Sequence, residues 1–180
     1  MGYLKSALEI IICNEKIISK ISNDKNATKW AILIPILVGI VSSIIGLLAN
    51  LLLSSIAPEL NTTTNYLLIL SYPITTLIMV LIWTTIIWIL SKLFRGKGTF
   101  IGLFRNFGLS SILFIFGAVP IVGLLTGVWG VVTSIFIVKS SQKLSGGKAT
   151  LVVLIPIILL FLLYAIIFAF LVSSMAQLIQ

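Results

Sequence analysis

Few side chains in this sequence could carry out acid–base or metal chemistry. The 180 residues include no histidine, a single cysteine, Cys13, and only four carboxylates. One cysteine cannot form a disulfide within the chain, and too few soft ligands remain for a zinc or iron–sulfur site. The commonest general base is also missing. We therefore predict that the protein is not an enzyme and binds no metal or cofactor.

One glycine-rich segment has the outline of a phosphate-binding loop. Gly147 and Lys148 match the end of the pattern G-x-x-x-x-G-K-[ST], which needs a glycine at position 142 and a hydroxyl residue at 149. This chain has Gln142 and Ala149 at those positions, and no strand-like segment precedes them. Nucleotide binding is not predicted.

The composition is that of a membrane protein. The sequence is 59% hydrophobic and 9% charged, whereas an ordinary soluble domain carries about 25% charged residues. Twelve basic and four acidic residues give a net charge of +8. In a soluble protein this excess would suggest a nucleic-acid partner. Here lipid must surround most of the chain, so we expect no nucleic-acid partner. The positions of the charges instead indicate how the chain is oriented in the membrane.

The charges leave four uncharged runs, at 30–58, 60–91, 106–138 and 149–180. A helix crosses the hydrocarbon core with about 20 residues, and lipid cannot satisfy an open backbone, so each run should hold at least one helical span. Basic residues precede the first run and follow the second and third, whereas the loop after the first run has only Glu59. Because basic loops stay in the cytoplasm, the third run must leave and return.

These arguments predict an all-α polytopic bundle of five transmembrane helices in the cell membrane, with a cytoplasmic N-terminus and an external C-terminus. Residues 1–29 form a cytoplasmic amphipathic segment and residues 30–180 form the membrane domain. The approximate spans are 30–56, 65–91, 100–119, 122–138 and 149–174.

The third and fourth spans share a short run. About 15 residues each would give helices of roughly 22 Å, less than the core of about 30 Å. The shortage shrinks if the third helix starts at Phe100 with Thr99 as its cap, while Arg105 extends outward at the membrane edge. We place the turn at Pro120–Gly123. A re-entrant hairpin is the alternative.

The N-terminal segment is predicted to be one amphipathic helix. At about 100° per residue, Lys5, Lys16 and Lys20 fall within an arc of about 60°, opposite an apolar side. Two arrangements remain open. The helix lies in the headgroup plane with its lysines toward anionic lipid, or it packs on the protein's own cytoplasmic face.

The cytoplasmic face is predicted to be strongly basic, and such residues attract anionic lipid by about 1 kcal/mol each. The alternative, which we favour for most of them, is that they only set the orientation. The candidates for a surface that binds anionic lipid or a partner are Lys5, Lys16, Lys20, Lys92, Arg95, Lys97, Arg105, Lys139, Lys143 and Lys148.

Eight of the 13 glycines lie between residues 96 and 130. Gly98 with Gly102, and Gly123 with Gly127, fit G-x-x-x-G, and Gly130 adds a further small position. Small residues let helix backbones approach closely in lipid. We favour the interpretation that these glycines allow helices to pack within one bundle. The alternative is that they form a homodimer face.

Polar groups within the spans are sparse. No acidic residue or histidine lies inside any run, which argues against proton-coupled transport. Pro35, Pro73 and Pro156 could break helices as in transporters, although they also occur in ordinary membrane helices. Hydroxyl groups are expected to bond to helices rather than to a substrate, at Ser42, Ser43, Thr75, Thr76, Thr84 and Thr85.

Two patterns resemble the Yip1 domain family. One is Lys92-Leu-Phe-Arg-Gly-Lys-Gly-Thr-Phe-Ile-Gly-Leu-Phe-Arg-Asn-Phe-Gly108, and the other is Leu144-Ser-Gly-Gly-Lys-Ala-Thr-Leu-Val-Val-Leu-Ile-Pro156. The resemblance covers about residues 29–172 and includes the family's topology of five spans, N-in and C-out. It implies a non-catalytic membrane scaffold. Eukaryotic relatives are associated with vesicle trafficking and Rab-type GTPases. This chain lacks their long cytosolic domain and Asp-Leu-x-Gly-Pro motif, so we expect a prokaryotic-type member.

The leading functional prediction is a scaffold that organises membrane or binds a partner at its basic cytoplasmic face. The alternative is a small transporter or channel subunit that uses the hydroxyl groups of the first two spans. The absence of charge inside the spans favours the scaffold. The expected partners are the lipid bilayer, anionic lipids, and a second copy or another membrane protein.

Overall fold

The computed structural model describes residues 2–56, 66–118 and 120–178, and every regular element in these ranges is a helix. Five helical segments are long and apolar enough to cross a membrane, which confirms the predicted all-α multi-pass architecture. The loop predicted around Glu59 lies outside the described residues. The elements are α1 (Tyr3–Ile11), α2 (Glu15–Asn23), α3 (Ala27–Ile56), α4 (Tyr66–Leu93), α5 (Phe100–Ser110), the 3-10 helix η2 (Ser111–Ala118), α6 (Pro120–Gln142) and α7 (Gly146–Leu178).

The third span gains its length from a change of helix type. Thr99 caps α5 by accepting a hydrogen bond from the N–H of Gly102 (3.1 Å), as predicted. The 11 residues of α5 continue into the eight residues of η2. A 3-10 helix rises about 2.0 Å per residue, so the two together extend about 32 Å. The span therefore matches the thickness of a hydrocarbon core.

The fourth span extends beyond the predicted boundary. Helix α6 has 23 residues and ends at Gln142, which gives it a length of about 34 Å. Helix α6 starts at Pro120, so the residues Pro120–Gly123 are helical and the turn predicted there is wrong. Proline is favoured at the first helical position because its missing N–H has no partner there in any case.

The N-terminal segment divides into two helices. The chain turns at Cys13, whose φ is 63°, and Asn14 caps α2 by accepting from the N–H of Ile17 (3.4 Å). One face of this hairpin packs against α5 and α6. The buried side chains on that face are Ser6, Ala7, Ile10, Ile18 and Ile21. The structure thus has the packed arrangement, with a break that the apolar periodicity did not predict.

Two glycines set the closest approaches between the long helices. A Cβ added to Gly39 of α3 would collide with the backbone of Pro73 in α4. One added to Gly108 of α5 would collide with Ala31 of α3. These contacts hold α3, α4 and α5 together, because close backbone approach substitutes for a hydrophobic drive that lipid does not provide.

The helices run unbroken through their prolines. Pro35, Pro73 and Pro156 lie inside α3, α4 and α7, each of which is one continuous helix. Five of the six predicted hydroxyls donate to the carbonyl four residues earlier: Ser43, Thr75, Thr76, Thr84 and Thr85. Discontinuous helices of the transporter type are therefore absent from α3, α4 and α7 as described.

Helix packing at Gly39 can be tested with a matched pair of substitutions in α3. Gly39→Ala should lower the stability by about 1–3 kcal/mol, because the added methyl must displace the Pro73 backbone. Gly46→Ala is the control, since a Cβ there meets nothing within 4 Å. It should be neutral or slightly stabilising. Thermal unfolding in mild detergent measures both, and equal stabilities would contradict the close contact.

Candidate functional site

The end of the bundle that carries the loops 94–99 and 143–145, here called the basic end, is organised around Asn106 of α5. This side chain is fully buried. Its Nδ2 lies within hydrogen-bonding distance of the carbonyls of Ile18 (3.2 Å) and Gly102 (3.0 Å). It also contacts the hydroxyls of Ser22 (2.9 Å) and Ser141 (3.2 Å). One amide therefore joins α2, α5 and α6.

Arg105 reinforces the same junction. Its Nε donates to the hydroxyl of Thr28 (2.8 Å) and its Nη1 donates to the carbonyl of Ser22 (2.8 Å). The side chain is half-buried. The guanidinium of Arg105 thus reaches acceptors in the packed hairpin and at the start of α3, which the sequence did not predict.

The two basic loops are joined at the backbone. The N–H of Lys97 donates to the carbonyl of Gln142 (2.8 Å), and the Gln142 side chain donates to the carbonyl of Thr99 (3.3 Å). A Cβ at Gly98 would collide with Ser141, and one at Gly102 would lie 3.0 Å from the Ser22 carbonyl. Both glycines thus lie where separate chain segments approach closely.

Three of the basic candidates make contacts inside the molecule. Lys92 donates to the carbonyls of Gly96 (3.1 Å) and Gly98 (2.9 Å), and Arg105 bonds as described above. Lys139 pairs with Glu15 at 2.6 Å. The hydrogen bond from Lys139 lowers the pKa of the Glu15 carboxyl. The other candidates are exposed: Lys5, Lys16, Lys20, Arg95, Lys97, Lys143 and Lys148.

Helix α1 presents an apolar stripe outward, one residue per turn. Leu4, Leu8 and Ile12 are 59%, 59% and 67% exposed. The carbonyl of Ile11 accepts from the indole of Trp129 (2.9 Å) and the hydroxyl of Thr133 (3.3 Å). Because Thr133 precedes Lys139 by six residues on α6, this end of α1 lies about 9 Å beyond the ion pair, toward the apolar part of the bundle.

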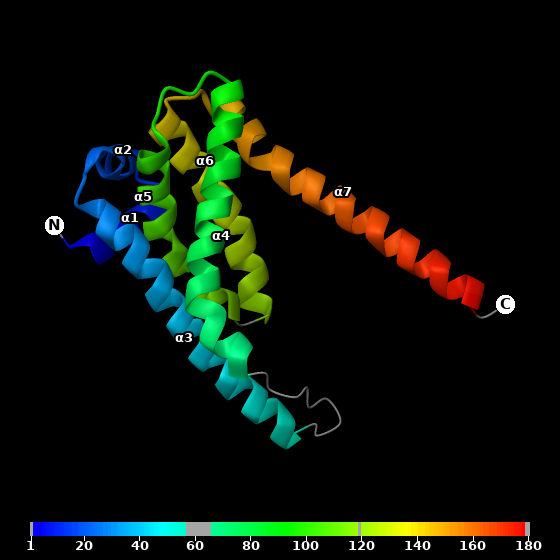
Figure 1. The fold of residues 1–180 in the computed structure, drawn as a ribbon. Coiled ribbons are helices and arrows are strands. Elements are labelled where there is room, and N and C mark those ends of the chain that lie inside the picture. The colour runs from blue at the N-terminus through cyan, green and yellow to red at the C-terminus, as the bar shows by residue number, and fades with distance from the viewer. Residues whose placement is uncertain (1, 57–65, 119, 179–180) are drawn as a thin grey trace.

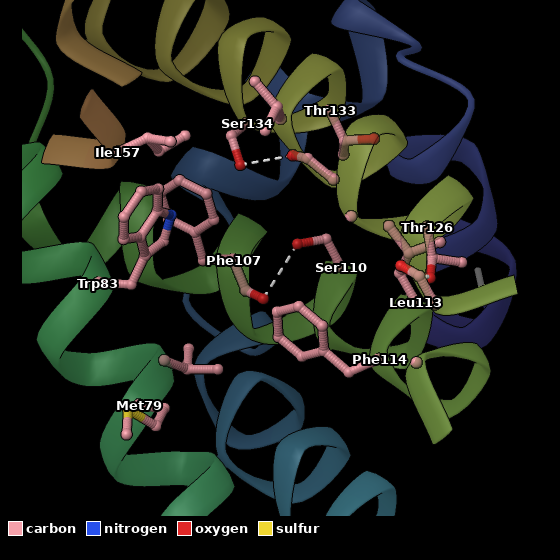
Figure 2. A pocket seen from close by; sticks show the side chains of 16 residues that line it. Met79, Trp83, Phe107, Ser110, Leu113, Phe114, Thr126, Thr133, Ser134 and Ile157 are labelled. Atoms are coloured by element: carbon pink, nitrogen blue, oxygen red, sulfur yellow. Dashed lines mark hydrogen bonds between the residues drawn. The ribbon is translucent and has the colours of Figure 1, made fainter. Parts of the chain in front are cut away.

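A pocket of about 450 Å³ lies deeper in the bundle, between α4, α5 with η2, and α6 (Figure 2). No charged residue lines it among those described. The hydroxyls of Ser110 and Ser134 are turned to the carbonyls of Phe107 (3.1 Å) and Gly130 (2.7 Å). The pocket therefore offers an apolar surface. The predicted packing positions Gly123, Gly127 and Gly130 are part of its wall.

The sequence analysis missed Asn106, Ser22 and Gln142. Asn106 is a carboxamide inside an otherwise apolar segment, and such residues commonly bond across helices in membranes. The signal was present, but the partners of Asn106 are distant in sequence. No cluster of three or more potential metal ligands occurs in the described ranges.

The family model for the Yip1 domain matches residues 8–168, nearly the whole chain. No curated protein matches the sequence. No solved structure matches it.

The Glu15–Lys139 pair should hold the N-terminal hairpin against α6. Glu15→Gln should increase the rate of thiol labelling at the neighbouring Cys13 by up to about fivefold, the limit for a partly exposed pair. The rate is compared per thiolate, because the Glu15 charge also helps to raise the pKa of the Cys13 thiol. Lys16→Gln, on the same helix but exposed, is the control and should leave the rate unchanged. Equal rates in all three proteins would show that the pair does not contribute.

The same pair should make hairpin docking depend on pH. Because the folded-state pKa of Glu15 is lowered, its contribution is present at neutral pH and is lost as the pH falls through that pKa. Hydrogen-exchange protection factors in α2 should decrease on acidification, and less so in Glu15→Gln. A decrease of the same size in both proteins would assign it to another group.

Proposed function

The chain belongs to the Yip1 domain family, and we propose from this premise that it is a non-catalytic membrane scaffold that binds the anionic leaflet at its basic end. The observation that carries this proposal is the apolar stripe of Leu4, Leu8 and Ile12, which is exposed beside a surface rich in lysine. Leu4, Leu8 and Lys5 lie on α1, and Lys16 and Lys20 lie on α2 of the same hairpin. Apolar and cationic groups on one surface are the combination that binds the boundary between headgroups and acyl chains.

The packing of the hairpin supports this role. Tyr3 stacks on Trp30 at 5.5 Å and donates to Asp24 (2.9 Å), which fixes the start of α1. Trp129 and Thr133 fix its other end through the Ile11 carbonyl. Because α1 is held at both ends, its helix is already ordered before it meets lipid. Binding therefore carries no further entropic cost for ordering this segment. The two arrangements considered for this segment are therefore compatible, one on each face of the helix.

The exposed lysines add an electrostatic part. Lys5, Lys16 and Lys20 could together contribute at most about 3 kcal/mol toward anionic lipid, at about 1 kcal/mol each. Arg95, Lys97, Lys143 and Lys148 extend the same surface across the joined loops. The scaffold would thus bring negatively charged headgroups, or an acidic partner, to one rigid face of the bundle.

The transporter alternative has less support. The hydroxyls of α3 and α4 that were considered as substrate ligands bond instead to their own helix backbones. Such groups have little capacity left for a solute.

The position of the stripe can be measured with a fluorophore. In a Cys13→Ser background, Leu8→Cys carrying an environment-sensitive dye should emit as in lipid and be quenched by spin-labelled acyl chains. Ser19→Cys, exposed on α2, should report water. Changing Lys5, Lys16 and Lys20 to Gln should reduce quenching in anionic vesicles and flatten its salt dependence. Emission typical of water from position 8 in both neutral and anionic vesicles would contradict the proposal.

The proposed orientation places the basic end in the cytoplasm and the C-terminus outside the cell membrane. Cysteines at Thr62 and Gln177 should then react with an impermeant thiol reagent added to intact cells. Cys13 and a cysteine at Gly146 should react only after permeabilisation. Labelling at 146 with protection at 177 would mean that the run 106–138 crosses the membrane only once.

A further inference from the structure

The pocket between α4, α5 with η2, and α6 lies at the depth of the hydrocarbon core. Its lining on α6 runs from Gly123 to Ser134, and α6 ends at Gln142. At about 1.5 Å per residue, the pocket therefore extends from about 12 to 28 Å below the basic end, along a span of about 34 Å. Headgroups lie at the two ends of a span, so the pocket faces the acyl chains.

The pocket opens sideways onto the surface that the spans present to lipid. Met79 of α4 and Phe114 of η2 line the pocket and are 60% and 57% exposed. Both belong to segments that are long and apolar enough to cross a membrane. Helix α7 lines the pocket at Ile157, and the next residue, Ile158, is already 53% exposed. The pocket is thus continuous with the interface between protein and lipid.

The hydroxyl groups of the lining are already bonded to the protein. Those of Ser110, Thr126 and Ser134 donate to carbonyls of their own helices, and that of Thr133 donates to a carbonyl of α1. The indole of Trp83 is the remaining N–H donor among the described lining side chains. A buried water needs about two to four polar partners, so this wall selects hydrocarbon over water.

The shape of the pocket selects a single chain rather than a helix. Its volume is about 450 Å³ and its lining on α6 extends over about 16 Å, so its mean cross-section is about 30 Å². A helix with its side chains has a diameter of about 10 Å and a cross-section of about 80 Å². A helix that covered the opening would insert single side chains and leave the rest of the length unfilled. An extended hydrocarbon chain fits the whole length, because carbon atoms pack about 4 Å apart.

We propose that the pocket binds one acyl chain of a membrane phospholipid, which enters from the side of the bundle. The chain supplies the dispersion contacts that an unfilled apolar wall lacks. Glycines make room for it, since a Cβ added at Gly127 or Gly117 would meet nothing within 4 Å. The bound chain lies among side chains that the surrounding bilayer does not reach. This binding does not depend on the charge of the basic end.

Photolabelling maps the position of the chain. The whole protein is reconstituted in neutral phosphatidylcholine vesicles that contain a phosphatidylcholine with a diazirine in the middle of its acyl chain. After irradiation, mass spectrometry should find adducts on Phe107 and Leu113, which line the pocket although they are only 5% and 8% exposed. Ile87 and Val138, which are buried outside the pocket, are the controls and should carry none.

Filling the pocket should expel the chain. Gly127→Leu should reduce the adducts on Phe107 and Leu113 by about fivefold or more, because the added side chain takes up part of the pocket. Gly46→Leu is the matched control, a helical glycine of α3 that also has nothing within 4 Å of an added Cβ. Adducts on Leu37, which is exposed on α3, should be the same in both variants.

Two results would overturn the proposal. An absence of adducts from the two interior residues, whether or not the exposed rim is labelled, would assign the pocket to a protein segment. Equal labelling of the interior in Gly127→Leu and Gly46→Leu would place the chain elsewhere. Gly117→Leu fills the pocket from η2 and gives the same comparison where Gly127→Leu does not fold. Because the vesicles are neutral, either result leaves the proposed role of the basic end unaffected.

Discussion

The carboxamide of Asn106 is the contact on which the basic end depends. Apolar side chains give little net drive for helices to associate in lipid, so polar contacts and close backbone approach decide which faces meet. The Asn106 amide reaches Ser22 and Ser141, which are 84 and 35 residues away in sequence. Arg105, one residue earlier, fastens the link between α2 and α3 through Ser22 and Thr28. A buried amide without these partners would be strongly unfavourable, so the junction forms as a unit.

That junction explains how one face of the molecule can be both basic and rigid. The hairpin of α1 and α2 is held by backbone carbonyls at Ile11, Ile18 and Ser22 and by the Glu15–Lys139 pair, so its packing does not depend on the exposed apolar stripe. Leu4, Leu8 and Ile12 are consequently free to face lipid, and the lysines to face headgroups. Lys92, Arg105 and Lys139 make contacts within the chain, and of these Lys92 is also exposed.

The opposite part of the bundle is held differently. Around the pocket the hydroxyls of Ser110 and Ser134 donate to their own helices, whereas that of Thr133 donates to the Ile11 carbonyl of α1. A Cβ added at Gly127 on the α6 wall would meet nothing within 4 Å. The side chains of α7 from Ile158 to Leu171 are exposed.

The sequence by itself determined the solvent, the helical class and the number of spans, because a chain with so few charges must bury its backbone in helices wherever lipid surrounds it. It also predicted the Thr99 cap, since capping is local. Only the tertiary structure decided which glycines form close contacts. Gly39 and Gly108 form them although neither lies in a G-x-x-x-G pattern, whereas Gly127 lies in such a pattern and forms none. The tertiary structure alone revealed the break at Cys13 and the bonds of Arg105 to Ser22 and Thr28. Every face of an apolar helix is equally compatible with lipid, so the hydrophobic pattern cannot specify which helix packs against which face. That pairing is decided by polar partners that are distant in sequence.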